Sequence, residues 1–184
     1  MEKEISYNQM VQKIKLIYSF GKLSDYLILA GGIVPYLVFN QNSNRLHSDI
    51  DFICKKEDID KIKDIFTSYG YYEREFDSLN ILKKDYGFEM FIDNIKVGVY
   101  PFEYSDGITQ YSYDSKIKEG KIKNINLDYD DYISSNKDFK HMSLEVILKS
   151  KVLAFRQKDI YDIDFILKHD INHKLYSKIN IERK

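Results

Sequence analysis

Residues 45–53 read RLHSDIDFI, a run in which two aspartates alternate with apolar residues. Alternate side chains of a β-strand lie on the same face. We therefore predict a strand over residues 47–54 that projects Asp49 and Asp51 to one side and its apolar residues to the other: Ile50, Phe52 and Cys54. Two adjacent ionised carboxylates repel each other, and a hard cation such as Mg²⁺ (or Mn²⁺) relieves that repulsion. The stretch therefore predicts a metal site.

A glycine pair, Gly31-Gly32, lies upstream at the end of an apolar run. Residues 26–30 are typical of a short strand, and residues 33–39 of a helix that tolerates Pro35 in its first turn. Backbone N–H groups at such a turn, with the positive end of a helix behind them, bind phosphate. The simpler interpretation, a turn that needs positive φ, is compatible with this one. Together the two stretches predict a metal-dependent nucleotide site.

The two stretches also resemble a known motif. Leu29-Ala30-Gly31-Gly32, a spacer, and Arg45-x-His47-Ser48-Asp49-Ile50-Asp51 are similar to the signature of the DNA polymerase β-like nucleotidyltransferase superfamily. The resemblance is strongest to its minimal branches, the lincosamide-type antibiotic nucleotidyltransferases and the AbiEii-like toxin nucleotidyltransferases. A second match follows in the family's order: Glu145-(x5)-Lys151-x-x-Ala154-x-Arg156-x-Lys158-Asp159-x-Tyr161-Asp162. The matches span residues 27–168.

The resemblance implies an enzyme that moves NMP from an NTP to a hydroxyl or phosphate acceptor. Asp49 and Asp51 would hold Mg²⁺, and pyrophosphate would leave. The implied nucleotide contacts are Gly31, Gly32, Arg45, Ser48, Lys151 and Asp159. The acceptor could be a small molecule such as an antibiotic, a tRNA end or a protein, and the same chemistry would suit the toxin of a two-gene system.

Lys151 is also conspicuous by its position. Helical spacing places it inside an apolar stripe of Leu144, Ile147, Leu148, Val152 and Phe155. A lysine that points toward the interior needs an anionic partner or a water-filled cleft, unless it extends to the helix edge. We expect its ammonium to face Gly31-Gly32, and we expect Lys151→Ala to weaken NTP binding with little effect on stability.

One position departs from the family pattern. The superfamily usually has a third carboxylate on a later strand, where this chain has Gly98 in Val97-Gly98-Val99-Tyr100-Pro101. We expect this strand to lie beside the aspartate strand, with Glu103, or less favourably Glu89, supplying the missing acid. The predicted catalytic set is Asp49, Asp51, Lys151 and Glu103. The alternative is a nucleotide-binding pseudoenzyme or regulatory module without turnover.

The composition sets limits on partners. The chain has 184 residues with 28 Lys+Arg, 29 Asp+Glu and a net charge of −1, which argues against strong nonspecific nucleic-acid binding. A single cysteine fits a reducing compartment, and no apolar stretch approaches the ~20 residues that span a bilayer. We therefore expect a cytoplasmic protein that does not enter the membrane.

The remaining periodicities predict an α/β fold, a mixed sheet flanked by helices. Helices are predicted over residues 4–20, 57–68, 143–157 and 159–168, and several strands over 71–103, including a hairpin of 88–92 and 95–102 around Asp93-Asn94. Residues 104–142 are expected to be mostly loops around one strand near 122–127, and the tail from Asn172 to be loosely ordered. Residues 1–142 would form the nucleotidyltransferase-like core, with 143–184 packed on it as a helical segment.

Overall fold

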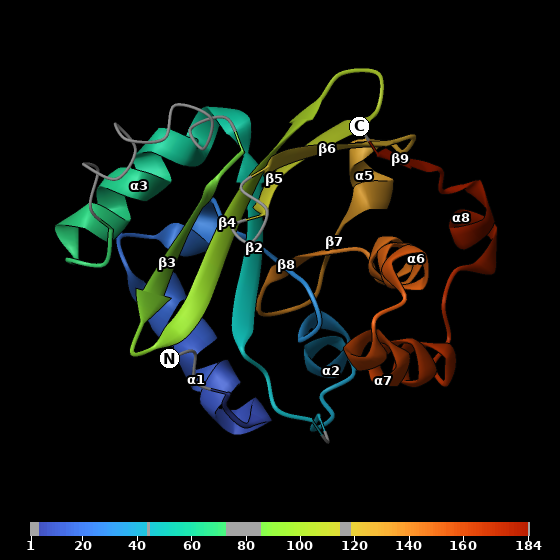
Figure 1. Ribbon diagram of the computed structural model, residues 1–184, viewed down its shortest axis with the longest axis horizontal. Helices are drawn as coiled ribbons and strands as arrows, with labels where there is room; N and C mark the ends of the chain where they lie inside the picture. Colours follow the sequence, from blue (N-terminus) through green and yellow to red (C-terminus); the bar gives the residue numbers. More distant parts are fainter. Residues whose placement is uncertain (1–3, 44, 73–85, 115–118, 184) are drawn as a thin grey trace.

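The computed structural model describes residues 4–43, 45–72, 86–114 and 119–183. One mixed sheet of nine strands organises the described chain, in the order β7-β8-β1-β2-β4-β5-β6-β9, with β3 paired to the first half of β4 (Figure 1). The strands are β1 Ile28–Ala30, β2 Asp49–Lys55, β3 Phe88–Ile92, β4 Ile95–Tyr104, β5 Ile108–Asp114, β6 Glu119–Ile125, β7 Ile133–Ser135, β8 Lys140–Met142 and β9 Ile181–Arg183. The helices are α1 Tyr7–Ser19, η1 Leu23–Asp25, α2 Val34–Val38, η2 Lys56–Asp58, α3 Ile59–Ser68, α5 Tyr129–Tyr132, α6 Leu144–Ala154, α7 Gln157–Leu167 and α8 His173–Lys178.

The aspartate strand, β2, lies near the middle of this sheet. It pairs antiparallel with β1 and parallel with β4, and the crossover to β4 contains α3. The register places Asp51 opposite Gly98, so the predicted neighbour relation of these two strands is confirmed. The predicted alternation along β2 is confirmed at Ile50, Phe52 and Cys54, which are buried on the face opposite the aspartates. The fourth apolar residue of the strand, Ile53, shares the aspartate face and is buried as well.

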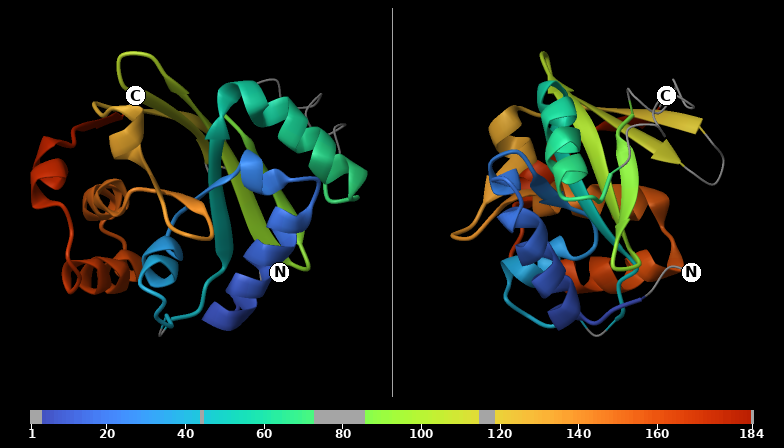
Figure 2. Two further views of the ribbon diagram at one scale, coloured as in Figure 1. Left: turned by 180° about the vertical axis from the view of Figure 1, so that it is seen from behind. Right: turned by 90° about the vertical axis from the view of Figure 1, so that its left-hand side faces the viewer.

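Helices α1 and α3 cover the apolar face of the sheet (Figure 2). The Tyr18 ring of α1 packs edge-on against Phe52, with ring centroids 5.7 Å apart, and Phe66 of α3 packs against Phe88 of β3 at 6.1 Å. The helix predicted over residues 57–68 is confirmed as η2 and α3, and the apolar side of α3 buries Ile59, Ile62 and Phe66 against the sheet, with Lys63 buried as well. The opposite face of the sheet therefore presents Asp49 and Asp51 to other parts of the molecule.

Helices α2, α6 and α7 lie beyond the β1 side of β2 (Figure 1). The helix predicted over 143–157 ends earlier, because Phe155 adopts a left-handed conformation with φ 44° and Arg156 begins the next helix as its N-cap. The apolar stripe predicted on this helix is only half right. Val152 and Phe155 are 40% and 68% exposed, since the helix stops packing on the core after Lys151.

Two expectations for the second half of the chain are wrong. Residues 104–142 hold four strands and a helix rather than mostly loops, because β5 and β6 are long strands with many polar residues, and these mask their pattern. The tail after Asn172 is ordered as α8 and β9, since β9 pairs antiparallel with β6 and Ile181 lies opposite Ile125.

Two further points concern the limits of the described chain. Several strands are predicted over residues 71–103, and the part of that range at 73–85 lies outside the described residues. Of the helices in the described ranges, none has the length and apolar character needed to cross a membrane.

Candidate active site

The Gly31-Gly32 turn stands between an acidic group and a basic group. Gly31 has φ +77°, and a Cβ atom there would lie 2.8 Å from Asp51 Oδ2. A Cβ atom at Gly32 would lie 2.3 Å from Arg45 Nη2, 2.8 Å from Asp162 Oδ2 and 3.4 Å from Lys151 Nζ. Gly31 is therefore needed for its left-handed backbone conformation, and Gly32 is needed because charged side chains approach its Cα closely.

The acidic group is formed by Asp49 and Asp51 on the open face of β2. Burial, and next the negative charge of Asp49, raise the pKa of Asp51 to about 6 from 3.8. The Lys158 ammonium lies 3.7 Å from Asp49 Oδ2 and supplies partial compensation. Burial and the neighbouring carboxylate thus both disfavour the ionised form of Asp51, and a bound divalent cation would favour it.

The basic group is organised by one buried carboxylate, Asp162 of α7, whose side chain is fully buried. It accepts hydrogen bonds from Arg45 Nε at 2.9 Å and Nη2 at 2.8 Å, from the Tyr36 hydroxyl at 3.0 Å and from Lys151 Nζ at 2.6 Å. Burial alone would raise the pKa of Asp162, but the Arg45 and Lys151 contacts outweigh it and lower that pKa. Residues from four separate segments are thereby fixed around Gly32.

A second buried carboxylate, Asp159, holds the other side of the Lys151 ammonium. Lys151 Nζ lies 3.2 Å from Asp159 Oδ1, and the Arg156 guanidinium donates to both Asp159 oxygens at 2.7 and 3.0 Å. Lys151 is only 7% exposed, so it does not extend to the helix edge. The prediction that Lys151 faces the space in front of Gly31-Gly32 is confirmed by its approach to Gly32.

The structure therefore brings together most of the side chains expected from the sequence. The assembled residues are Gly31, Gly32, Arg45, Asp49, Asp51, Lys151 and Asp159; Ser48 is half-buried and directly precedes β2. Glu103 is not among them. It lies five residues beyond Gly98 in β4, on the opposite face by strand alternation, and its carboxylate bonds to Tyr111 and to Lys56. The prediction that Glu103 rather than Glu89 lies near the position of the missing acid is therefore wrong.

Glu89 is the acid beside the vacant position. The register aligns Asp51, Gly98 and Glu89 across β2, β4 and β3. Glu89 Oε1 accepts hydrogen bonds from the Tyr100 hydroxyl at 2.8 Å and from Lys96 Nζ at 3.1 Å. The Tyr100 hydroxyl occupies the space over Gly98, since a Cβ atom there would lie 2.6 Å from it. A side chain at position 98 and the Tyr100–Glu89 bond exclude each other.

The sequence pattern alone predicts no site role for four residues that the structure places here: Tyr36, Lys96, Tyr100 and Arg156. It also favoured Glu103 over Glu89 as the missing acid. A signal for Glu89 was present in the sequence. A two-residue turn at Asp93-Asn94 pairs Ile92 with Ile95, and counting outward then pairs Glu89 with Gly98. The tyrosines gave no such signal, because their roles depend on contacts with residues far away in the sequence.

The donor set fits a magnesium ion. Within the described ranges, no three His, Cys, Asp or Glu side chains group closely enough to hold a metal by themselves. Magnesium in nucleotide enzymes usually takes one or two carboxylates and completes its octahedron with substrate phosphates and water. Asp49 and Asp51 offer that number of carboxylates, beside a turn suited to phosphate.

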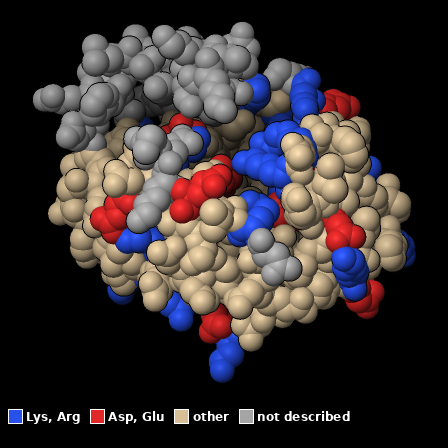
Figure 3. Space-filling view, turned by 60° about the horizontal axis from the view of Figure 1, so that its bottom comes forward, with Lys and Arg blue, Asp and Glu red and all other residues tan. Residues whose placement is uncertain are grey.

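The charges gather at one hollowed face of the molecule. In Figure 3, acidic side chains and a larger group of basic side chains border the same hollow. Three cations, Arg45, Lys151 and Arg156, share the two carboxylates Asp159 and Asp162, so this part of the site keeps a net positive charge. Positive charge next to an acidic pair suits a ligand that consists of a polyanion and its cation.

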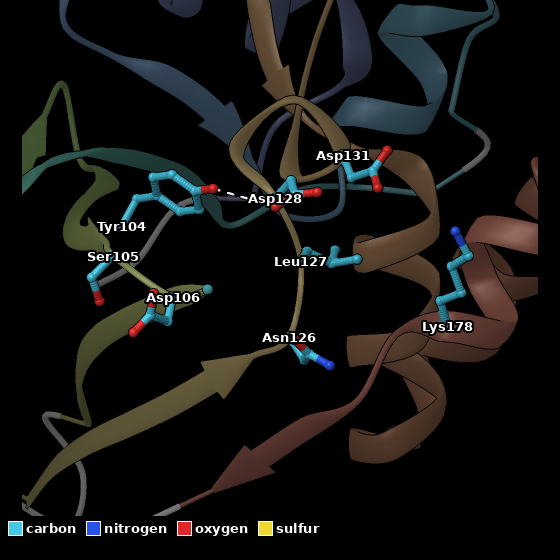
Figure 4. A pocket seen from close by; sticks show the side chains of 9 residues that line it. Tyr104, Ser105, Asp106, Asn126, Leu127, Asp128, Asp131 and Lys178 are labelled. Carbon is cyan, nitrogen blue, oxygen red and sulfur yellow. Dashed lines mark hydrogen bonds between the residues drawn. The ribbon is translucent and has the colours of Figure 1, made fainter.

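A separate pocket of about 560 Å³ lies away from these residues (Figure 4). It is formed by the β4–β5 turn, residues 126–128, Asp131 and Lys178 of α8, and the Tyr104 hydroxyl donates to Asp128 at its edge. None of the residues assembled around Gly31-Gly32 lines it. The candidate site is therefore defined by the contacts at the glycine turn and not by this pocket.

Comparisons with known proteins agree with the architecture. No family model matches the chain, and a search of curated proteins finds no match. Among solved structures, the chain is similar to the solution structure of the antibiotic-resistance factor ANT(2'')-Ia, with a TM-score of 0.62 and 15% sequence identity. The superposition covers 92% of this chain and 88% of the ANT(2'')-Ia chain. The chain thus has a nucleotidyltransferase-type fold, a curled mixed α/β sheet flanked by helices.

Proposed function

We propose that the protein is a Mg²⁺-dependent nucleotidyltransferase that transfers NMP from an NTP to a hydroxyl or phosphate acceptor. The observation that carries this proposal is the Gly31-Gly32 turn, which touches Asp51 on one side and the Arg45–Lys151 group on the other. A triphosphate at this turn would meet backbone N–H groups and two cations along its β- and γ-phosphates. Its α-phosphate would then lie toward Asp49 and Asp51.

In this assignment Asp49 and Asp51 would hold Mg²⁺, which supplies charge neutralisation at the phosphates. Arg45 and Lys151 offset the charge that develops on the leaving pyrophosphate, and Asp159 and Asp162 hold both cations in place. The acceptor oxygen forms a bond to the α-phosphorus, and the bond from that phosphorus to the bridging oxygen breaks. A hydroxyl acceptor releases its proton to a nearby base.

Glu89 is the acid that we assign to this proton, in place of Glu103. Two strand spacings of ~4.8 Å separate its backbone from that of Asp51. Gly98 lies between them without a side chain, and the Tyr100 ring that lies over Gly98 donates a hydrogen bond from its hydroxyl to Glu89. Tyr100 and Lys96 fix the Glu89 carboxylate over this gap. A carboxylate from β3 thus does the work that a residue at position 98 would otherwise do.

The test is incubation of the purified protein with each α-labelled NTP, Mg²⁺ and a cell extract, with label transfer and pyrophosphate release as readouts. We expect Asp49→Asn to abolish Mg²⁺-dependent NTP binding. We expect Glu89→Gln to reduce turnover by about 10²-fold with NTP affinity retained, and Glu103→Gln, the matched control, to leave both unchanged.

A pseudoenzyme would give a different pattern. The NTP would bind with Mg²⁺ and protect the protein, yet no pyrophosphate would appear with any acceptor fraction. Absence of Mg²⁺-dependent NTP binding in the wild-type protein would contradict the proposal altogether.

A further inference from the structure

The Tyr100 hydroxyl lies between Asp51 and Glu89. The register places Gly98 directly opposite Asp51 on β2 and directly opposite Glu89 on β3, so the three residues form one row on the same face of the sheet. Tyr100 follows two residues later on that face, and its hydroxyl oxygen lies 2.6 Å from where a Cβ atom at Gly98 would be. The hydroxyl therefore fills the place in the row where Gly98 has no side chain.

This hydroxyl is bonded in a way that lets it pass a proton on. It donates to Glu89 Oε1 at 2.8 Å, and Lys96 Nζ holds the same carboxylate oxygen from 3.1 Å. A hydroxyl has one donor and two acceptor lone pairs, so the Tyr100 oxygen can accept a hydrogen bond while it donates to Glu89. Burial raises the pKa of Tyr100, and the hydroxyl therefore stays protonated between transfers.

The row also sets the route by which a proton reaches Glu89. In the proposed function the α-phosphate lies toward Asp49 and Asp51, and the attacking oxygen of the acceptor must come to the same place. A general base acts on a proton within hydrogen-bond reach or through one hydrogen-bonded intermediate. Because the Tyr100 hydroxyl stands between Asp51 and Glu89, a proton that leaves the acceptor there meets this hydroxyl before it meets the carboxylate.

Only one of the two acceptor classes needs such a route. A phosphate monoester loses its second proton with a pKa of about 6, so its oxygen is already ionised at neutral pH and attacks without a base. A hydroxyl keeps its proton until the attack begins. A buried phenol that joins the acidic pair to a carboxylate held by Lys96 is therefore suited to a hydroxyl acceptor.

We propose that Tyr100 is a catalytic residue that passes the proton of a hydroxyl acceptor to Glu89. This inference rests on the proposed function and narrows its acceptor to the hydroxyl class. As the acceptor oxygen bonds to the α-phosphorus, its proton moves to the Tyr100 oxygen and the Tyr100 proton moves to Glu89 Oε1. The bond from the α-phosphorus to the bridging oxygen breaks, and its electron pair leaves with pyrophosphate. Tyr100 ends the step neutral, and the Glu89 carboxyl, which is 19% exposed, releases the proton to water.

The test measures pyrophosphate release from the Mg²⁺ complexes of ATP, GTP, CTP and UTP. Glycerol and glucose are the defined hydroxyl acceptors, inorganic phosphate is the phosphate acceptor, and the cell extract supplies natural acceptors. With a hydroxyl acceptor, we expect Tyr100→Phe to lower kcat by about 10²-fold while the KM for NTP is retained. Tyr111→Phe is the matched control, because the Tyr111 hydroxyl donates to Glu103 and not to Glu89, and its turnover should equal that of the wild-type protein.

A double variant separates proton transfer through Tyr100 from mere positioning of Glu89. If the proton passes through the hydroxyl, Tyr100→Phe already removes the contribution of Glu89, and adding Glu89→Gln causes no further loss. If Tyr100 only holds the carboxylate in place, Lys96 still holds it in Tyr100→Phe, and Glu89→Gln then lowers turnover about tenfold more. The second result would overturn the proposal.

The remaining outcomes separate this inference from the proposed function. Full turnover in Tyr100→Phe, or turnover with inorganic phosphate and none with a hydroxyl acceptor, would overturn the relay and leave nucleotidyl transfer intact. NMP that stays covalently bound to the wild-type protein but not to Tyr100→Phe would make the hydroxyl itself the acceptor and overturn the relay as well. Absence of Mg²⁺-NTP binding in the wild-type protein would contradict the proposed function and the relay together. Urea denaturation checks that Tyr100→Phe retains the fold.

Discussion

Lys151 shows how one residue can serve both folding and binding. Its ammonium lies between Asp159 and Asp162, whose side chains are fully buried. A cation removed from a buried ion pair leaves uncompensated charge, at a cost of roughly 3–5 kcal/mol. Because Asp162 keeps Arg45 and Asp159 keeps Arg156, the lower end of that range applies here. The sequence alone predicts that Lys151→Ala barely changes stability. The two buried ion pairs of Lys151 instead imply that the substitution is clearly destabilising.

We predict that Lys151→Ala lowers the free energy of unfolding by about 3 kcal/mol and also weakens NTP binding. Lys149→Ala on the same helix is the matched control. That lysine stacks over the Tyr176 ring, with its Nζ 4.9 Å from the ring centroid, and its loss should cost about 1 kcal/mol or less. Urea denaturation of both variants measures the difference, and equal effects would contradict the buried-pair argument.

Gly32 makes a second prediction at this scale. Its φ is not in the left-handed region, so alanine fits the backbone, but the added Cβ collides with the Arg45 guanidinium and Asp162. Gly32→Ala should weaken Mg²⁺-NTP binding by about tenfold or more, because it displaces the triphosphate contacts. Gly70→Ala is the converse control. Its Cβ meets open space at φ +77°, so backbone strain should cost about 1 kcal/mol while NTP binding is unchanged. Fluorescent-nucleotide titration distinguishes the two.

At the scale of elements, the α6–α7 junction positions the basic group. Helix α6 ends at Ala154, and Arg156 is the N-cap residue of α7. Its backbone N–H donates to Asp159 Oδ2 at 3.1 Å, and the Asp159 backbone N–H donates to the Arg156 carbonyl at 2.8 Å. The left-handed Phe155 between them turns the chain so that both helices aim charged residues at Gly32. A continuous helix through residues 144–167 could not bring Lys151 and Asp162 within 2.6 Å, because eleven residues span about three turns of helix.

The same junction predicts a pH dependence of stability. Burial alone would raise the pKa of Asp159, but the Arg156 hydrogen bonds and the Lys151 charge lower it to about 2 from 3.8. As the pH falls, Asp159 is therefore protonated in the unfolded chain at a higher pH than in the folded protein. Above pH 4 the ionised carboxylate adds about 2 kcal/mol to the free energy of unfolding, and this contribution is lost as the pH falls through 2. Asp159→Asn should flatten the unfolding free energy between pH 4 and pH 2. If urea denaturation shows the same dependence of the unfolding free energy on pH for Asp159→Asn and for the wild-type protein, then Asp159 does not cause this pH dependence.

The whole molecule couples ligand binding to folding, because the site is assembled from segments distant in sequence. Gly32, Arg45, Lys151 and Asp162 meet only when β1, the loop before β2, α6 and α7 have docked. A ligand that contacts all of these segments binds the folded state and not the unfolded chain. Its binding free energy therefore adds to the stability of the entire domain.

We predict that an NTP with Mg²⁺ at 100 times its dissociation constant stabilises the fold by about 2.7 kcal/mol. For a chain of this size that corresponds to a rise in Tm of about 5–10 °C. The rise should require both components and should vanish in Asp49→Asn, while Mg²⁺ alone gives a smaller shift. A rise with NTP in the presence of EDTA would contradict metal-dependent binding. Differential scanning fluorimetry measures all four conditions.

The local pattern of the sequence determined the parts of the site that depend on strand alternation and on turns. Residues 45–53 carry the period of two that places Asp49 and Asp51 on one face, and Gly31-Gly32 marks the strand-to-helix turn. The Asp93-Asn94 turn fixes its hairpin and, through counting, the position of Glu89 opposite Gly98. These features need only neighbours along the chain, so they are legible without a structure.

Only the tertiary structure decided which charged residues share a partner. The sequence placed Glu103 near Gly98 by distance along β4, but alternation and the bonds to Lys56 and Tyr111 direct it elsewhere. The meeting of Arg45 with Asp162, 117 residues apart, depends on how α7 docks. Such contacts depend on how whole helices and strands pack together. The packing energy is spread over many residues, so it cannot be inferred from any short stretch of sequence.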